Sequence, residues 1–335
     1  STSLIASDKL DTNDYFFFFK HLIYILLGIS IIVFFSSINQ KDLFNLSIYL
    51  FFICLFFLIL VPVIGTEVKG SKRWLDLFFL PRFQPIELLK PFTIIILSTI
   101  LASERNVNIY IKYLFSFFVI LPIVFLLAAQ PDIGQTLLLL SCWAILIFVS
   151  GISLVLLSIF FGFSFITLIY MIIFLPKFEY IKNRILSFLN PSEGTYNFQS
   201  DKAIESIISG GFFGKGIGEG TLKNKVPEAH TDYIVSVISE EFGVVVIILL
   251  LISFLSLLYM VFKKIYFEQN EKIKLILVGS ITLILLQAII HLGVNIRLFP
   301  TTGMTLPYLS YGGSSIISIS ILSGIILNLT KRKIY

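Results

Sequence analysis

Charged residues are scarce in this 335-residue chain: Asp, Glu, Lys and Arg make up 13% of it, whereas 57% is hydrophobic. Soluble domains contain about 25% charged and about 45–50% apolar residues. Together with a mean hydropathy of +0.95, this composition excludes an ordinary soluble domain. We expect an all-α, polytopic integral membrane protein.

Cysteine is also nearly lacking. Cys54 and Cys142 lie inside apolar runs without ligand spacing, which predicts packing residues and no disulfide or cysteine metal site. Residues 1–14 have no cationic n-region and no cleavage site, so we do not expect a signal peptide. The formal net charge of +5 favours anionic partners such as lipid phosphates.

Long apolar runs are what the sequence has in abundance. A hydrocarbon core of about 30 Å needs about 20 apolar residues per helix. Nine runs reach or approach this length, which predicts chain ends on opposite sides of the membrane. They are Phe16–Ser36, Phe44–Ile64, Pro85–Ala102, Tyr113–Ala129, Ile133–Val149, Ile152–Leu175, Tyr233–Phe262, Leu275–Ile296 and Tyr308–Leu329.

Orientation does not follow from a simple count of cations, because the loops on both sides contain many. The clusters 263–264 and 331–333 directly follow span ends and favour a cytoplasmic C-terminus. A long loop over 176–231 joins the sixth and seventh runs, and loops of this length are usually functional. Within it, 181–189 and 203–208 are expected to form short amphipathic helices at the lipid surface.

Two polar motifs occur in the first half of the chain. Residues 65–74 form either a solvated loop anchored by Trp74 or a phosphate clamp that uses the planar donor fork of an arginine. In the second motif, Glu87 and Lys90 are three residues apart and can pair on one helix face. Charges inside a membrane helix suggest function, and the alternative is a self-neutralising pair that orders the helix.

Two further motifs favour structural interpretations. Asp132 followed by Gln135 predicts an N-cap, with the Gln135 side chain reaching back to the cap. The glycine-rich stretch 210–220 lacks the Lys-Ser/Thr ending of a P-loop, so we reject nucleotide binding. Its glycines are expected to permit tight turns or close backbone approach.

The stretch 214–243 is the most informative of the chain. Asp232 begins an apolar helix, where a carboxylate is favoured by the helix dipole alone. However, His230 shares its turn, and Ser236, Ser239 and Glu240 continue a polar stripe down the helix. Such stripes face a bundle interior or a wet cavity. We therefore identify Asp232 as the best catalytic candidate.

The last polar stretch, 300–315, has two prolines and three glycines, which prevent a regular helix entry. Irregular backbone at membrane depth is tolerated where it lines protein or water. The small residues are equally consistent with close helix packing. Ser310, Gly312 and Gly313 are the binding candidates here.

Seven of these motifs together resemble the SEDS family of bacterial cell-wall enzymes. They occur in family order over nearly the whole chain and are closer to the cell-division branch than to the elongation branch. They are Arg73-Trp74, QPIELLK at 84–90, AQPDIGQT at 129–136, GGFFGKGIGEG at 210–220, PEAHTDY at 227–233, EEFG at 240–243 and LPYLSYGGSS at 306–315.

The resemblance implies a single SEDS domain over 1–335, with ten transmembrane helices and both ends cytoplasmic. The first run of this chain corresponds to the second family helix, so we expect the first helix to be missing and 1–14 to be an extracytoplasmic remnant. The loop 176–231 becomes the large extracytoplasmic loop. Family members often have Ser, Lys and Phe where this chain has Ile86, Thr302 and Tyr233.

The resemblance also implies the activity, which is the polymerisation of lipid II into glycan strands. Asp232 matches the catalytic carboxylate, and Arg73 and Lys90 match functionally important charges. An acceptor hydroxyl attacks the anomeric carbon while lipid pyrophosphate leaves, so a base and cations are needed. The expected binding residues are Arg73, Lys72, Lys90, Glu87, His230, Ser310, Gly312 and Gly313, with Glu240 and Asp132 as secondary candidates.

The expected cofactors and partners follow from this activity. No metal-ligand spacing is evident, so a divalent cation, Mg²⁺ or Mn²⁺, would bind through the pyrophosphate. Expected partners are lipid II, a class B penicillin-binding transpeptidase and other divisome proteins at the septal inner membrane, without nucleic acid. A lipid II flippase and a non-catalytic division scaffold are the alternatives. Polar motifs concentrated at one face favour surface chemistry over transport.

Overall fold

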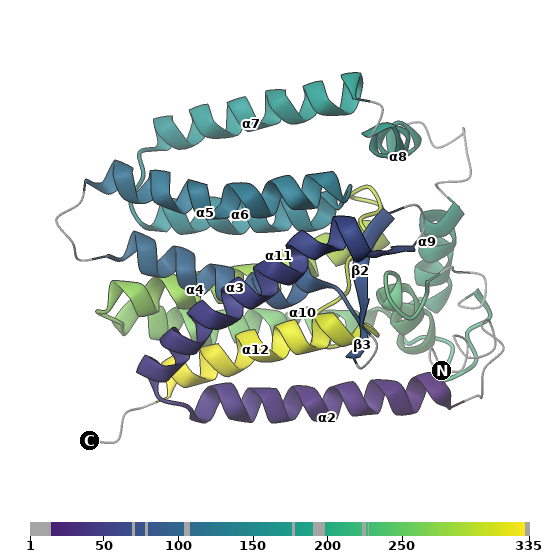
Figure 1. Ribbon diagram of the computed structural model, residues 1–335. Coiled ribbons are helices and arrows are strands. Elements are labelled where there is room, and N and C mark those ends of the chain that lie inside the picture. Colours follow the sequence, from purple (N-terminus) through teal and green to yellow (C-terminus); the bar gives the residue numbers. More distant parts are fainter. Residues whose placement is uncertain are drawn as a thin grey trace. The chain divides into compact units, whose positions relative to one another are not determined.

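The helices of the chain follow its apolar runs. The computed structural model describes residues 15–68, 71–77, 80–103, 108–175, 178–189, 198–222, 226 and 228–331, so the predicted remnant 1–14 lies outside the described residues. Within these residues, each of the nine predicted runs contains a helix (Figure 1). The helices are α2 Phe16–Ser37, α3 Gln40–Ile64, α4 Pro85–Leu101, α5 Ile109–Ala129, α6 Ile133–Val149, α7 Leu154–Phe174, α10 Ile234–Phe267, α11 Glu271–Asn295 and α12 Gly313–Thr330.

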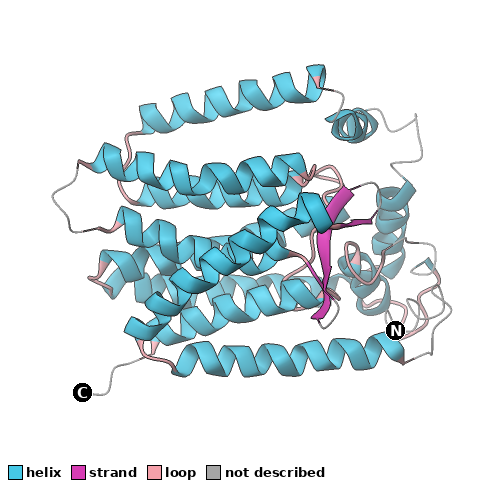
Figure 2. Cartoon of the chain, in the orientation of Figure 1, coloured by secondary structure: helices cyan, strands magenta, loops and turns pink. Residues whose placement is uncertain are grey.

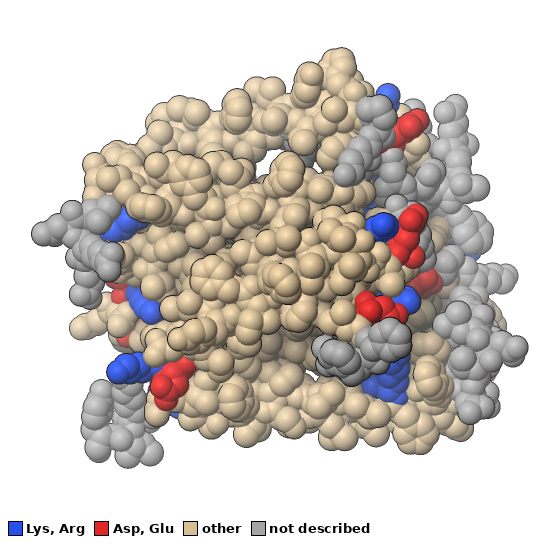
Figure 3. All heavy atoms as spheres, in the orientation of Figure 1, with Lys and Arg blue, Asp and Glu red and all other residues tan. Residues whose placement is uncertain are grey.

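Seven of these helices are long and apolar enough to cross a membrane, namely α2, α3, α5, α7, α10, α11 and α12. The helices α4 and α6 have 17 residues each. Figure 3 shows largely uncharged surface along the helices and charged side chains near their ends. Many large apolar side chains of α2, α3, α5 and α7 are exposed, as expected for helices that face lipid.

A small antiparallel sheet is the element that the sequence did not predict. Its strands are β1 Thr66–Val68, β2 Ser71–Leu77 and β3 Leu80–Phe83, in the order β1-β2-β3 (Figure 2). The expectation of an all-α chain is therefore corrected by a three-stranded sheet between α3 and α4. The side chains of β2 alternate between its two faces, and Leu75 is fully buried.

The described chain forms two compact units. The described residues of unit 1 lie within 1–25, 163–257 and 285–312, and those of unit 2 lie within 26–162, 258–284 and 313–335. In unit 2, α4 is the central helix and packs against α3, α5, α6 and α12. Most of its side chains are buried, which is typical of a helix that is apolar on all sides.

Unit 1 contains the two short helices α8 Glu179–Leu189 and α9 Phe198–Gly210. They confirm that the segments 181–189 and 203–208 are helical. The core of this unit joins α9, the start of α10 and the end of α11. Its buried apolar residues are Ala203, Val226, Ala229, Tyr233, Val237 and Val294.

The helix α10 is broken at Gly243, where φ is 77° and ψ is −178°. The glycine-rich loop fills this break: the Val244 amide donates to the Gly211 carbonyl at 3.0 Å, and the Lys215 amide donates to the Glu240 carbonyl at 2.9 Å. A Cβ on Gly243 would lie 2.2 Å from the Phe212 carbonyl oxygen. Inside the predicted stretch, a Cβ on Gly214 would lie 2.2 Å from the Glu241 carbonyl oxygen, which confirms that a glycine of 210–220 permits close backbone approach.

Candidate active site

Asp232 lies half-buried in the turn immediately before α10. The Glu228 carbonyl accepts the Asp232 amide at 3.1 Å, and Asn295 at the end of α11 donates its Nδ2 to the Asp232 carbonyl at 3.1 Å. The Oδ1 of Asn295 accepts the Ser236 amide at 3.3 Å. The first amides of a helix lack intrahelical acceptors. Asn295 therefore caps α10 from a neighbouring helix and fixes the backbone that carries Asp232.

The turn before α12 fastens the same segment. The hydroxyl of Ser310 donates to the Thr231 carbonyl at 2.7 Å and accepts the Leu306 amide at 2.8 Å. The Tyr311 amide donates to the His230 carbonyl at 3.0 Å. Ser310 is 1% exposed, so in the structure this predicted binding residue is buried and connects its own turn to the segment before α10. Gly312 and Gly313 follow it and are half-buried.

Aromatic rings surround the predicted binding residue His230. Its ring centroid lies 6.2 Å from that of Phe17 and 5.9 Å from that of Tyr311. Burial raises the pKa of the Tyr311 hydroxyl to about 12, so this phenol stays neutral at physiological pH. His230 lies two residues before Asp232 in the sequence, and its ring packs against uncharged aromatic rings.

Gly303 approaches the carboxylate itself. A Cβ on this glycine would lie 3.6 Å from Asp232 Oδ2, and its φ of 72° favours glycine. The adjacent Tyr233 is 1% exposed. Burial raises the pKa of Tyr233, the negative charge of Asp232 raises it further, and the Arg184 guanidinium opposes this. Arg184 is thus a cation within electrostatic range of the residue next to Asp232.

Glu240 is fully buried and holds the glycine-rich loop. Its Oε1 accepts the amides of Thr221 at 2.9 Å and Leu222 at 3.0 Å, and lies 3.4 Å from Lys215 Nζ. Its Oε2 accepts the Ser206 hydroxyl at 3.1 Å. A carboxylate with these donors is engaged in loop structure, which makes Glu240 a poor second candidate for the base.

Unit 2 contains a separate polar cluster, which we call the α4–α6 network: Glu87, Lys90 and Gln135. Lys90 Nζ lies 2.9 Å from Glu87 Oε2 and donates to Gln135 Oε1 at 2.9 Å. The Gln135 Nε2 donates to Glu87 Oε1 at 2.6 Å. Lys90 is 0% exposed, so its charge is compensated inside the protein. The structure brings Glu87 and Lys90 together, as their spacing predicted.

Asp132 caps α6 beside this network. Its Oδ1 accepts the Gln135 amide at 3.4 Å, which confirms the predicted N-cap, and its Oδ2 accepts Gln84 Nε2 at 2.9 Å. The Gln135 side chain was expected to reach back to the cap, but it joins Glu87 and Lys90 instead. Burial raises the pKa of Asp132, and the nearby Arg73 guanidinium opposes that rise.

Arg73 and Lys72 leave β2 on opposite faces, because neighbouring strand residues alternate. Arg73 donates its Nε to the Gln130 carbonyl at 3.3 Å and its Nη2 to the Pro131 carbonyl at 2.6 Å. Lys72 is exposed and pairs in register with Glu67 on β1. The 65–74 motif is therefore part of a sheet and not a plain loop, and phosphate binding by Arg73 or Lys72 stays a prediction.

No group of three or more His, Cys, Asp or Glu residues in the described part of the chain is arranged to hold a metal ion. Sequence reasoning also did not single out Asn295, which bonds to the Asp232 carbonyl, or Arg184, which acts on the adjacent Tyr233. The signal for Asn295 was present, since a polar residue near the end of an apolar run suggests a specific partner. Arg184 and Arg297 belong to a polar pocket that is described below.

Comparison with known proteins covers the whole chain. Residues 1–335 match a family model, FTSW_RODA_SPOVE, described as a cell cycle protein. The probable peptidoglycan glycosyltransferase FtsW of Wigglesworthia glossinidia brevipalpis is 35% identical over 320 residues, which cover 92% of this chain and 82% of that protein.

Two solved structures share the fold. A chain of a structure described as "Structural coordination of polymerization and crosslinking by a peptidoglycan synthase complex" is 28% identical, with a TM-score of 0.78 over 94% of this chain and 89% of that chain. The rod shape determining protein RodA of Thermus thermophilus is 27% identical, with a TM-score of 0.67 over 93% of this chain and 86% of that chain.

Proposed function

The chain belongs to the FtsW, RodA and SpoVE family of cell cycle proteins, and from this premise we propose that it polymerises lipid II into peptidoglycan glycan strands. Relatives with about a third of their residues identical are named peptidoglycan glycosyltransferases. The chain is accordingly an enzyme of glycosyl transfer and a multi-pass membrane protein. The SEDS resemblance of its motifs is confirmed by the family match.

Asp232 acts as the general base in this proposal. The carboxylate takes the proton of an acceptor sugar hydroxyl while that oxygen bonds to the anomeric carbon of the donor. The bond from this carbon to the pyrophosphate oxygen breaks, and the lipid pyrophosphate leaves with its negative charge. A positioned base typically contributes about 10²–10⁴ in rate.

The observation that carries the proposal is how Asp232 is held. Its backbone is fixed by Asn295 and Glu228, whereas its carboxylate is half-buried and approached by Gly303. Fixed geometry with partial exposure suits a base, because a substrate hydroxyl must reach it and misplacement by about 1 Å can cost about 10²-fold.

The cations of unit 2 have two different roles in this proposal. Arg73 is 20% exposed at its side chain and binds a substrate phosphate with guanidinium donors other than those that contact Gln130 and Pro131. Lys90 is buried against Glu87 and Gln135, so its part is to hold α4 and α6 together. Direct phosphate binding by Lys90 stays a prediction, as does binding by Lys72, Glu87, His230 and the glycines 312 and 313.

The finer topology is also proposed. The nine helices each span the membrane, 176–231 is the large extracytoplasmic loop, and the C-terminus is cytoplasmic. The relative in the peptidoglycan synthase complex supports a partner that crosslinks strands. We infer a class B penicillin-binding transpeptidase at the septal inner membrane, together with other divisome proteins.

The test uses the purified full chain with lipid II, with products separated on a gel. Wild-type protein is expected to give a ladder of glycan polymers. Asp232→Asn keeps the size of the side chain but cannot accept the proton, so polymer yield should fall by about 10²-fold or more. Its unfolding temperature should match that of the wild type.

Asp42→Asn is the matched control, because Asp42 is an exposed residue in the first turn of α3. It makes the same atomic change and is expected to leave the ladder intact. Near-wild-type polymer from Asp232→Asn would refute the base assignment. No polymer from the wild type with lipid II and its transpeptidase partner would refute the proposed activity.

A further inference from the structure

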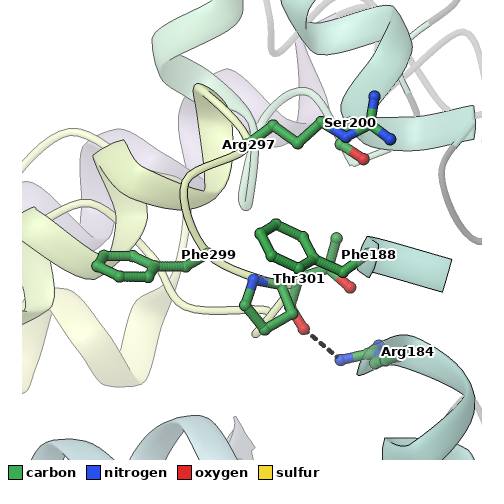
Figure 4. A pocket seen from close by; sticks show the side chains of 7 residues that line it. Arg184, Phe188, Ser200, Arg297, Phe299 and Thr301 are labelled. Atoms are coloured by element: carbon green, nitrogen blue, oxygen red, sulfur yellow. Dashed lines mark hydrogen bonds between the residues drawn. The ribbon is translucent and has the colours of Figure 1, made fainter. Parts of the chain in front are cut away.

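A small, partly open pocket in unit 1 is not used by the proposed base. It lies between α8, α9 and the turn after α11 (Figure 4). The lining residues are Arg184, Phe188, Ser200, Arg297, Phe299, Pro300 and Thr301. Two guanidinium groups in one pocket are the feature that needs an explanation.

The charge of the pocket is positive. Arg297 Nη1 lies 2.5 Å from Asp201 Oδ1, so these three charged side chains together have a net charge of +1. The Nη2 of Arg297 is buried and has no hydrogen-bond acceptor among the described residues. A buried donor without an acceptor is costly, and more so when it is charged. An anion in the pocket would supply that acceptor.

The backbone conformation of Arg297 also supports an anion site. Its φ of 58° lies in the left-handed region, where a residue with a long side chain costs roughly 1–2 kcal/mol and Gly or Asn is favoured. Unfavourable backbone of this kind is concentrated at functional sites. The guanidinium is thus held in the pocket at the expense of backbone conformation.

The pocket is also connected to Asp232. Arg184 Nη1 donates to the Thr301 carbonyl at 2.7 Å (Figure 4). Thr301 is two residues before Gly303, which approaches the Asp232 carboxylate. The turn 300–303 is therefore bonded to the pocket through Thr301 and approaches the proposed base through Gly303.

We propose that Arg184 and Arg297 form a subsite for a phosphate ester. Guanidinium forks match phosphate oxygens bidentately, and the rings of Phe188 and Phe299 offer apolar surface beside them. The phosphate comes either from the pyrophosphate of the lipid-linked substrate or from the headgroup of an anionic phospholipid. Binding of the substrate pyrophosphate rests on the proposed function, whereas the existence of a phosphate subsite does not.

The first experiment measures binding of inorganic pyrophosphate to the purified full chain by calorimetry. Arg297→Asn removes the guanidinium and suits the left-handed backbone, so the variant should fold normally and bind pyrophosphate about 10-fold more weakly or worse. Asp201→Asn should bind it more tightly, because a competing carboxylate is lost. Lys202→Asn, which removes another ion-paired cation of α9, should bind like the wild type.

These variants separate the subsite from a structural ion pair. A purely structural pair predicts that Arg297→Asn and Asp201→Asn both lower the unfolding temperature and leave pyrophosphate affinity unchanged. Unchanged affinity in Arg297→Asn, or no pyrophosphate binding by the wild type, would overturn the proposal.

The second experiment identifies the source of the phosphate. The KM for lipid II is measured in nanodiscs of phosphatidylcholine and in nanodiscs that contain phosphatidylglycerol. A substrate subsite predicts that Arg297→Asn raises KM about 10-fold in both, with kcat nearly unchanged. A headgroup subsite predicts an unchanged KM and a loss of phosphatidylglycerol retention. Failure of the proposed function can be told apart from failure of the subsite. In the first case the wild type binds pyrophosphate but makes no polymer.

Discussion

Asp132 and Asp232 both precede a membrane helix, yet the structure treats them differently. In unit 2, Asp132 is 3% exposed and caps α6 with its own carboxylate, which also receives Gln84 and faces Arg73. In unit 1, Asp232 is half-buried, and the amide of Ser236 is capped by Asn295 from α11. The cap of α10 therefore does not depend on the Asp232 carboxylate alone.

The difference shows how one residue type at one kind of position acquires two roles. A buried charge is stable only when it is paired and hydrogen-bonded, so Asp132 and its neighbours are committed to structure. A carboxylate whose local structure is held by another residue can meet a substrate instead. The two aspartates differ in where the helix cap comes from: Asp132 caps α6 with its own carboxylate, whereas α10 is capped by Asn295.

The largest expected effect comes from breaking the α4–α6 network. Lys90→Met leaves the Glu87 carboxylate buried without its cation, which should lower the unfolding free energy by about 3–5 kcal/mol. Unfolding of the purified chain in detergent measures this. The double variant Glu87→Gln with Lys90→Met removes both charges and keeps an acceptor for Gln135, so it should recover most of the stability.

The double variant also tests the role of Lys90. If Lys90 only holds the helices, polymer yield should recover together with stability. A stable double variant that no longer binds pyrophosphate would instead give Lys90 the direct role that its family resemblance implies.

The next effect concerns the cap of α10. Asn295→Ala removes one of the two acceptors of the Ser236 amide and the donor to the Asp232 carbonyl, which should cost about 1–2 kcal/mol of stability. Polymer yield should fall by about 10-fold or more, because the proposed base, Asp232, loses its position.

Asn328 provides a matched control in unit 2. Its amide donates to the carbonyls of Phe35 and Ile38 at the end of α2. Asn328→Ala should cost a similar amount of stability but leave the activity per folded molecule unchanged. Equal activity losses in the two variants would mean that Asn295 acts through general stability only.

A smaller effect is expected at Arg73. Arg73→Lys keeps the charge but cannot reproduce the planar fork that contacts Gln130 and Pro131. We expect a loss of about 1 kcal/mol in unfolding free energy and weaker pyrophosphate binding. Lower stability with unchanged pyrophosphate affinity would show that Arg73 serves only to anchor β2 to the α5–α6 turn.

The smallest expected effect is a dependence of stability on pH through Asp132. It is small because the Arg73 guanidinium opposes the rise in pKa that burial causes. The pKa of this carboxyl is raised in the folded state above its ordinary value of 3.8. At a pH between the ordinary pKa of the unfolded chain and the higher pKa of the folded protein, the folded protein binds more protons than the unfolded chain. The unfolding free energy should therefore rise as the pH falls from the higher pKa to the lower one, and level off below the lower one. Asp132→Asn should remove this rise, and a pH series of unfolding curves for the two proteins measures it.

The sequence predicted much of the fold because hydrophobic run length determines membrane helices. The apolar runs became helices, the Asp132 cap formed, and the glycines of 210–220 made the close contacts expected of them. Local patterns of this kind need no knowledge of distant residues.

The features that were missed depend on residues far apart in sequence. Asn295 caps a turn about 60 positions earlier, and Arg184 contacts the Thr301 carbonyl more than 100 positions later. The strands β1–β3 contain too few apolar alternations to differ from a polar loop. The sequence made Glu240 a secondary candidate for the base, because it does not show that the loop amides of Thr221 and Leu222 donate to this carboxylate.

The break at Gly243 has a consequence for how the enzyme meets bilayers of different thickness. An unbroken α10 of 34 residues would be about 51 Å long, well beyond a hydrocarbon core of about 30 Å. The piece after the break, 244–267, is about 36 Å long and can tilt to match the membrane by itself. The glycine-rich loop holds both sides of the break, through the Glu240 carbonyl before it and the Val244 amide after it. We therefore expect hydrophobic mismatch to be absorbed by the far part of the second piece, and the orientation of the turn that contains Asp232 to change little with lipid chain length.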